Sequence, residues 1–219
     1  MKRSPISGFD HGLELLSCLM DVLINQMKET NPMLLAVAGG SCSGKSLLAQ
    51  RLAEDLKKNS LDVSVLNFDD YYKDKNHLSF PFDEAGRAIF DLPESYLLDE
   101  FRHDVEILLS GQSIASPVYD KKTNKRLPGI GRKVKTGSII VTEGLFVLQA
   151  LDGLDNVLKI FIEADNDIRV ARRIKRDTGL LHDTEADTLR FILERVEPYY
   201  QKYVAPQIEQ ADIVIINND

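Results

Sequence analysis

The sequence predicts an α/β protein with a mainly parallel sheet flanked by helices, and three observations carry this prediction. Residues 34–38 form an apolar run that ends at two glycines, which is typical of a strand buried on both faces. A helical pattern at 45–58 and a second strand pattern at 63–68 follow, so these three segments predict a βαβ unit. Strand and helix patterns then alternate to the end of the chain, which favours a layered α/β fold.

The remaining elements follow in chain order. Apolar spacing at 13–28 predicts an amphipathic helix that Asn31-Pro32 stops. In the helix at 45–58 we expect an inner face made of Leu47, Leu48, Leu52 and Leu56. Residues 69–93, rich in Asp, Tyr and Pro, predict a functional loop. The rest of the pattern predicts a helix at 94–109, a small hairpin within 118–135 turning around 127–129, strands at 138–142 and 157–162, a basic helix at 167–176, an amphipathic helix at 184–196 carrying Leu189, Ile192, Leu193 and Val196, and a last strand at 212–216.

A length of 219 residues fits one domain with an appendage. We therefore expect an N-terminal helical extension at 1–30 and a main domain at 31–219. The extension either packs on the main domain or mediates dimerisation, so the sequence leaves a homo-oligomer open.

Composition excludes several classes of protein. With 43% hydrophobic and 28% charged residues, the composition disfavours a disordered chain, a collagen-like chain and a coiled coil. A formal net charge of −7 disfavours non-specific binding to DNA or RNA, which needs a large basic surface. The apolar stretch at 13–24 contains Glu14 and Asp21, so it is too short and too charged to span a membrane. Two cysteines, Cys18 and Cys42, fit a reducing cytoplasm, where we expect this protein to reside.

The strongest motif lies between the first strand and its helix and matches G-x-x-x-x-G-K-[ST] at every fixed position: Gly39, Gly40, Ser41, Cys42, Ser43, Gly44, Lys45 and Ser46. Glycines let the backbone bend so that successive N–H groups reach phosphate oxygens, and the helix that follows adds its positive end. We expect Lys45 to reach the outer phosphates and the Ser46 hydroxyl to bind Mg²⁺. Cys42 is expected to be a small loop residue rather than a nucleophile.

Acidic residues follow two predicted strands. Glu143 directly follows the strand at 138–142, at the carboxyl edge where ligands bind in open α/β sheets, and is the predicted second group at the metal. Asp69 directly follows the strand at 63–68 and is the predicted proton acceptor for a substrate hydroxyl. Asp70 is expected to cap a turn, and Tyr71 and Tyr72 either flank a ring or ribose or pack in the core.

Four arginines share one face of the basic helix, at positions i, i+3, i+4 and i+7: Arg169, Arg172, Arg173 and Arg176. Such a stripe suits a phosphoryl group whose charge is shifting. The alternative is a solvated basic face paired with acidic residues, and Arg169 is expected to be the most structural of the four.

Taken together, these residues resemble the uridine kinase family of P-loop nucleoside kinases, which is related to the phosphoribulokinases. The resemblance covers about residues 33–216, and its most specific parts are Asp-Asp-Tyr-Tyr-Lys-Asp at 69–74 and Pro-Val-Tyr-Asp at 117–120. The other matching stretches, in the family's order, lie at 39–46, 77–80, 90–93, 143–144, 172–173, 176–177 and 211–212.

The resemblance implies ATP as the donor and the 5′-hydroxyl of a pyrimidine nucleoside as the acceptor. It implies a P-loop kinase fold with a five-stranded parallel sheet, a small β-hairpin at about 117–135 and a mobile helical lid at about 177–190. For the chemistry it implies Asp69 as the base, with Lys45 and Arg173 as further catalytic residues. The implied acceptor contacts are Asp91 at a ribose hydroxyl, Tyr72 and Tyr119 around the nucleoside, and Arg173 and Arg176 at the acceptor or the transferred phosphate.

Three positions depart from the family pattern. Leu92 stands where the family usually has histidine, and residues 178–182 stand where its lid usually carries Arg-Gly-Arg. Asn124 replaces a histidine that helps recognise the base, and is itself a predicted acceptor contact. These departures predict poor use of uridine and cytidine. Two alternatives therefore stay open: a kinase of another nucleoside, a sugar phosphate or another hydroxylated metabolite, and a nucleotide-binding regulatory protein without turnover, against which Lys45, Ser46, Asp69 and Glu143 argue.

Overall fold

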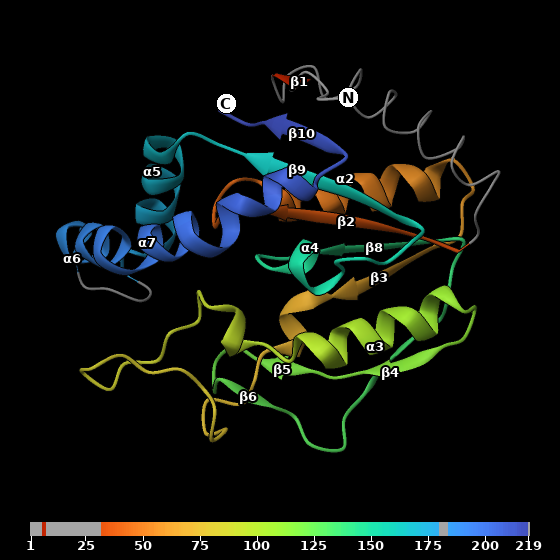
Figure 1. Ribbon diagram of the computed structural model, residues 1–219, viewed down its shortest axis with the longest axis horizontal. Coiled ribbons are helices and arrows are strands. Elements are labelled where there is room, and N and C mark those ends of the chain that lie inside the picture. Colours follow the sequence, from red (N-terminus) through yellow and green to blue (C-terminus); the bar gives the residue numbers. More distant parts are fainter. Residues whose placement is uncertain (1–5, 8–31, 180–183, 219) are drawn as a thin grey trace.

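The computed structural model describes residues 6–7, 32–179 and 184–218. Within them the main sheet is wholly parallel, in the order β1-β10-β9-β2-β8-β3 (Figure 1). Its strands are β1 (Ile6–Ser7), β2 (Met33–Gly39), β3 (Val63–Asn67), β8 (Ile139–Glu143), β9 (Val157–Glu163) and β10 (Ile213–Ile216). The five predicted strands are confirmed. A short strand that was not predicted, the two-residue β1, pairs with β10 within the segment expected to be a helical extension. The helix predicted at 13–28 and Cys18 lie outside the described residues.

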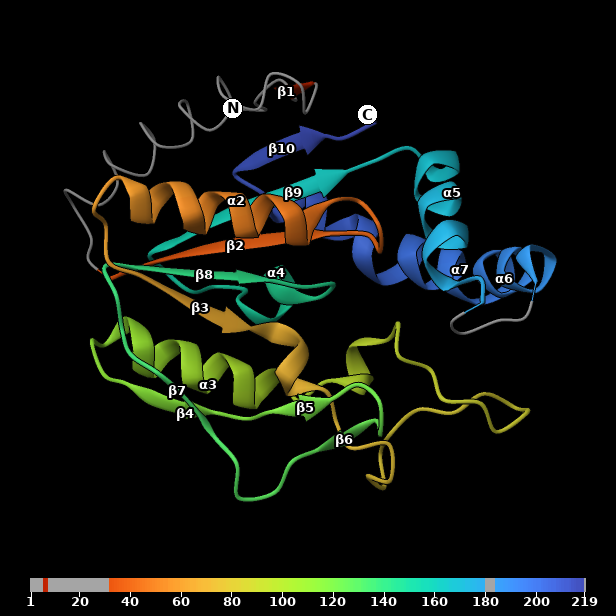
Figure 2. The same ribbon diagram turned by 180° about the vertical axis from the view of Figure 1, so that it is seen from behind.

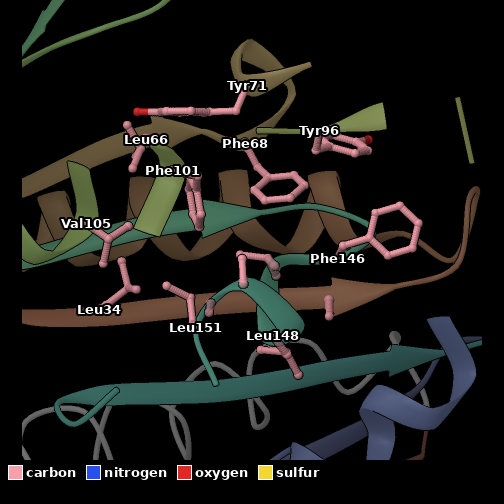
Figure 3. Close-up of a cluster of buried hydrophobic side chains, with 14 of the residues drawn as sticks. Leu34, Leu66, Phe68, Tyr71, Tyr96, Phe101, Val105, Phe146, Leu148 and Leu151 are labelled. Carbon is pink, nitrogen blue, oxygen red and sulfur yellow. The ribbon is translucent and has the colours of Figure 1, made fainter. Parts of the chain in front are cut away.

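The central strand β2 is buried on both faces because all seven of its residues are apolar or glycine. Met33, Leu35 and Val37 share one buried cluster with Leu48, Leu52 and Leu56 of helix α2 (Lys45–Lys58). Figure 2 shows α2 lying across this face of the sheet. On the opposite face Leu34 packs in a second cluster with residues of α3 (Leu98–Leu109) and α4 (Val147–Ala150) (Figure 3). Apolar burial on both faces holds the strand ends in fixed register.

Three predictions about helices were wrong in detail. Leu47 is 46% exposed, since it lies about 100° around α2 from Leu48 and further still from Leu52 and Leu56. Leu189 and Leu193 are also exposed, because the neighbouring stripe of Ile192 and Val196 is the one that packs inward. Helix α3 begins at Leu98 rather than at 94, because Pro93–Ser95 forms a separate 3₁₀ turn.

The predicted hairpin is longer than expected and turns at a different place. Strands β4 (Ile114–Ser116) and β7 (Arg132–Val134) pair antiparallel, and β5 (Tyr119–Asp120) and β6 (Lys125–Arg126) pair further along. The tight turn is therefore at residues 121–124, and the Leu-Pro-Gly sequence at 127–129 lies in the irregular return segment. We call residues 114–134 the hairpin arm.

The remaining helices begin beyond the carboxyl ends of the strands, and the last helical turns run back along the sheet beside β9 toward β10 (Figures 1 and 2). They are α5 (Asn166–Asp177), α6 (Glu185–Phe191) with a π-helical continuation at Ile192–Val196, and α7 (Glu197–Tyr199), followed by a second π-helical turn at Tyr200–Val204 and a 3₁₀ turn at Ala205–Gln210. Residues 180–183 of the predicted lid lie outside the described residues. In the described part of the chain, none of the helices has the length and apolar character needed to cross a membrane.

Candidate active site

The glycine-rich loop at 39–46 connects β2 to α2 at the carboxyl edge of the sheet, as predicted. Gly44 has φ +99°, and a Cβ there would lie 2.3 Å from Nδ2 of Asn217. The Asn217 amide donates a 2.7 Å hydrogen bond to the Ser43 carbonyl, so the segment after β10 is bonded directly to the glycine-rich loop. Only glycine fits both the left-handed backbone and this close support.

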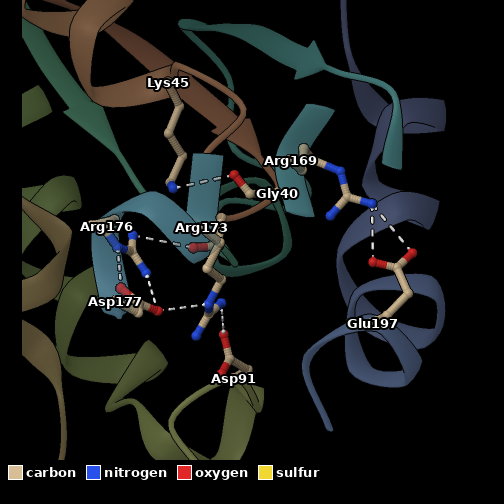
Figure 4. A network of polar contacts seen from close by, with 9 residues as sticks. Gly40, Lys45, Asp91, Arg169, Arg173, Arg176, Asp177 and Glu197 are labelled. Atoms are coloured by element: carbon tan, nitrogen blue, oxygen red, sulfur yellow. Dashed lines mark hydrogen bonds and ion pairs between the residues drawn. The ribbon is translucent and has the colours of Figure 1, made fainter. Parts of the chain in front are cut away.

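The loop presents polar groups suited to a polyphosphate. Lys45 Nζ lies 3.5 Å from the Gly40 carbonyl, with its side chain folded back over the loop (Figure 4). Ser43 Oγ is buried and has no hydrogen-bond partner among the described residues. Because a buried hydroxyl is rarely left unpaired, the loop fits a ligand that supplies additional acceptors.

Ser46 and Glu143, the two predicted metal ligands, are in direct contact. The Ser46 hydroxyl donates a 2.8 Å hydrogen bond to Glu143 Oε1. Parallel pairing of β8 with β2 places Glu143 opposite Val37, beside the loop. Mg²⁺ in kinases is held by one or two carboxylates together with substrate phosphates and water, so this pair fits the ion. The described residues contain no group of three or more His, Cys, Asp or Glu that could hold a metal ion.

The residue after Glu143 packs against the strand that leads to the predicted base. A Cβ at Gly144 would lie 2.3 Å from Cδ1 of Phe68, a fully buried ring that directly precedes Asp69. The carboxyl ends of β8 and β3 are therefore in contact, because the backbone of Gly144 after β8 packs against the ring of Phe68 after β3.

Asp69 and Asp70 have different environments, although they are adjacent in the chain. Asp70 is 3% exposed, and its carboxylate accepts a 3.1 Å hydrogen bond from the Tyr119 backbone N–H and a 2.8 Å bond from Arg132. Both partners belong to the hairpin arm, so Asp70 anchors the arm instead of capping a turn. Asp69 is more exposed, and its carboxylate forms a 2.7 Å ion pair with Lys121. Of the two, Asp69 is the carboxylate available to a substrate.

Aromatic side chains surround the space beside Asp69. The ring of Tyr72 stacks on Tyr96 with centroids 4.0 Å apart and lies 5.2 Å from the ring of Tyr119. The Tyr119 hydroxyl is buried with no hydrogen-bond partner among the described residues, and burial raises its pKa to about 12. Tyr119 is thus a neutral hydroxyl that can donate to a ligand.

Asn124 occupies the last position of the tight turn in the hairpin arm. Its φ is +54°, in the left-handed region that asparagine tolerates better than most residues. Its carbonyl accepts a 3.0 Å hydrogen bond from the Lys75 N–H, which ties the turn to the loop after Tyr72. The structure therefore gives this residue a backbone role in addition to the predicted contact with the acceptor.

The basic helix α5 directs its arginines to different partners (Figure 4). Arg169 is buried, stacks on Tyr200 and pairs with Glu197 at 3.1 Å, so it fastens α5 to the following helices, in line with its expected structural role. The Arg172 guanidinium donates to the Cys42 carbonyl at 3.1 Å. Arg173 and Arg176 both pair with Asp177.

The predicted acceptor and phosphate residues meet at Arg173. Its Nη1 lies 3.5 Å from Oδ1 of Asp91, the predicted ribose contact, and makes no hydrogen bond within the described residues. Arg176 Nη1 lies 3.4 Å from Oγ of Ser41 in the glycine-rich loop. The structure therefore brings the loop, the arginines and Asp91 to one place.

Three residues at the site were not predicted as site residues. Lys121 contacts Asp69 and Asn217 contacts the loop only through the tertiary fold, so sequence spacing carries no signal for either. Asp177 could have been found, because it lies four residues after Arg173 on a helix, the spacing at which opposite charges pair.

Comparison with known proteins agrees with this geometry. Residues 34–218 match the phosphoribulokinase/uridine kinase family. The chain is 35% identical over 185 residues to a uridine kinase from Deinococcus deserti. This match covers 84% of this chain and 87% of that protein.

Solved structures show the same fold at low sequence identity. A possible uridine kinase from Bacillus stearothermophilus is 18% identical with a TM-score of 0.57, and the match covers 90% of this chain and 98% of that one. A D-glycerate 3-kinase from Cryptococcus neoformans is 14% identical with a TM-score of 0.58, covering 85% of this chain and 87% of that one.

Proposed function

The chain belongs to the phosphoribulokinase/uridine kinase family, and from this premise we propose that it transfers the γ-phosphoryl group of ATP to the 5′-hydroxyl of a pyrimidine nucleoside. It is an ATP- and Mg²⁺-dependent phosphotransferase that acts on an alcohol group. The identity of that alcohol, and the roles of the individual residues below, are the proposal. We also propose a cytoplasmic enzyme that does not act on nucleic acid.

The observation that carries the proposal is the hydrogen bond of Ser46 to Glu143, with Asp69 in the turn that directly follows the neighbouring strand β3, at the same edge of the sheet. On the donor side, the backbone of 39–46, Lys45 and Ser46 would hold ATP, and Ser46 and Glu143 would hold Mg²⁺. When bound there, Mg²⁺ would neutralise charge on the phosphate oxygens.

On the acceptor side, Asp69 takes the proton of the hydroxyl while the hydroxyl oxygen forms its bond to the γ-phosphorus and the bond to the ADP oxygen breaks. Lys45, Arg173 and Arg176 stabilise the negative charge spread over the transferred group. Tyr72 and Tyr119 flank the nucleoside, and Asp91 accepts hydrogen bonds from the ribose. Asn124, at the tip of the hairpin arm, is the residue that we propose to contact the base.

One observation favours a second candidate acceptor. Lys121 places an ammonium group 2.7 Å from the Asp69 carboxylate, where the acceptor hydroxyl must come. A cation at this position suits an acceptor that carries its own negative charge, such as a sugar phosphate.

A panel of acceptors tests both candidates. ADP formation from ATP and Mg²⁺ should be stimulated by uridine or cytidine if the nucleoside proposal is correct, and by sugar phosphates if the second candidate is. Lys121→Met should weaken the use of charged acceptors only, with Lys122→Met, its neighbour in the same turn, as the matched control. Absence of stimulation by every hydroxylated acceptor would contradict the proposed function.

A further inference from the structure

Asp177 is the most deeply buried carboxylate at the candidate site. It is the last residue of α5 and is 2% exposed. Its oxygens accept hydrogen bonds from Arg173 Nε at 3.1 Å, Arg176 Nε at 2.6 Å and Arg176 Nη2 at 3.1 Å. Burying a carboxylate is unfavourable unless it is paired and hydrogen-bonded, and these three bonds meet that requirement.

Asp177 does not bond to Nη1 of Arg173 or to Nη1 of Arg176, so these two nitrogens face other groups. Arg173 uses Nε for Asp177 and directs Nη1 toward Asp91, where this buried nitrogen has no hydrogen bond among the described residues. Arg176 uses Nε and Nη2 for Asp177 and leaves Nη1 near Ser41 of the glycine-rich loop. Figure 4 shows both arginines converging on Asp177 from the same helix.

We propose that Asp177 is a positioning residue for phosphoryl transfer, which locks Arg173 and Arg176 into the orientations that face the acceptor and the glycine-rich loop. The inference rests on the proposed function, because it takes these arginines as the groups that stabilise the transferred phosphoryl. An arginine side chain has many rotamers, and a charged two-point contact selects one of them before substrate arrives.

Asp177 stands at the C-terminal end of α5. Helix α5 ends at Asp177, the next residue turns to extended backbone, and Gly179 has φ +77°. The carboxylate therefore fixes the arginines at the point where the chain leaves α5 toward α6.

Steady-state kinetics of Asp177→Asn test the proposal. Residues that orient a contact group typically affect activity by about 10- to 100-fold when removed, so kcat should fall by that factor. The KM for ATP should change far less, because the loop, Lys45 and Ser46 are intact. Glu106→Gln is the matched control: its carboxylate accepts from Arg102 Nε at 3.1 Å, also with i,i+4 spacing, on the surface of α3.

A double-mutant cycle separates positioning from general stability. In an Arg173→Ala, Arg176→Ala background, Asp177→Asn should cause little further loss of kcat, because no arginine remains to be positioned. Equal losses in both backgrounds would overturn the proposal, as would a folded Asp177→Asn enzyme with wild-type kcat. If Asp177→Asn does not fold, Asp177→Glu, which keeps the charge but moves it by one methylene, serves in the same cycle with the same criteria. A wild-type protein without any acceptor-dependent turnover would instead contradict the proposed function, which is a separate outcome.

Discussion

Ser46 and Glu143 are 97 positions apart in the chain, yet the Ser46 hydroxyl donates a 2.8 Å hydrogen bond to the Glu143 carboxylate. We predict that Glu143→Gln raises the Mg²⁺ concentration needed for half-maximal turnover by at least about tenfold, because the ion loses its charged protein ligand. Titration of activity with Mg²⁺ at saturating ATP measures this shift. Glu54→Gln, an exposed change on α2, is the control, and an unchanged Mg²⁺ requirement in Glu143→Gln would remove Glu143 from the metal site.

Lys45→Ala should lower kcat by on the order of a hundredfold or more, since it removes a positive charge from the transferred phosphoryl group. The fold should be unaffected, because the Lys45 side chain lies over the loop and outside the apolar core. Turnover and circular dichroism are measured together, with Lys58→Ala at the other end of α2 as the control. Wild-type turnover by folded Lys45→Ala protein would contradict the P-loop assignment.

Asp69→Asn should mainly lower activity, whereas Asp70→Asn should mainly lower stability. Asp69→Asn removes the proton acceptor and should lower turnover by at least about a hundredfold with little change in ATP binding. Asp70→Asn should mainly lower the thermal midpoint, because the buried carboxylate that anchors the hairpin arm loses its charge. Loss of turnover in Asp70→Asn alone, at unchanged stability, would reverse the two assignments.

Asn124→His should raise the turnover of uridine, because histidine tolerates φ +54° and supplies an aromatic ring that can contact the nucleobase. Asn124→Val should destabilise the hairpin arm, since a β-branched residue fits this backbone poorly, and Asn124→Gly should not. The unmodified protein should use uridine with kcat/KM below about 10⁴ M⁻¹s⁻¹. A higher value would show that the departures at Leu92 and Asn124 do not weaken pyrimidine use.

The free energy of unfolding should depend on pH through the protonation of Asp177. Burial opposes its charged form, but the hydrogen bonds and charges of Arg176 and Arg173 outweigh this effect and lower the pKa of Asp177. The stabilisation is therefore complete above the unfolded-state pKa of about 3.9 and is lost as pH falls through the lower folded-state pKa. Urea unfolding between pH 7 and pH 2 should show a smaller acid loss for Asp177→Asn than for the wild type, and parallel losses would contradict the pairing.

Local patterns predicted the strands and the glycine-rich loop because their physical causes are local. The all-apolar β2 and the glycines after it are both visible in consecutive residues. Glu143 and Asp69 were placed correctly at the strand ends because parallel strands share a carboxyl edge.

Contacts made by the hairpin arm could not be predicted from spacing. The tight turn lies at residues 121–124 because Asp70 fixes the Tyr119 N–H and Arg132, and this carboxylate is 49 positions from the first and 62 from the second. The exposure of Leu47, by contrast, could have been predicted, because the residues at helical spacing from it, Gln50, Arg51 and Glu54, are polar.

The contact of Gly144 with Phe68 makes the distance between the proposed metal ligand Glu143 and the proposed base Asp69 depend on the absence of a single methyl group. Any side chain at position 144 would collide with the ring that precedes Asp69. The collision would spread β8 and β3 apart at their carboxyl ends and separate Glu143 from Asp69. Substitution here should therefore impair catalysis without removing any group that touches substrate, and suppressor substitutions should arise at Phe68, as smaller side chains that restore the space.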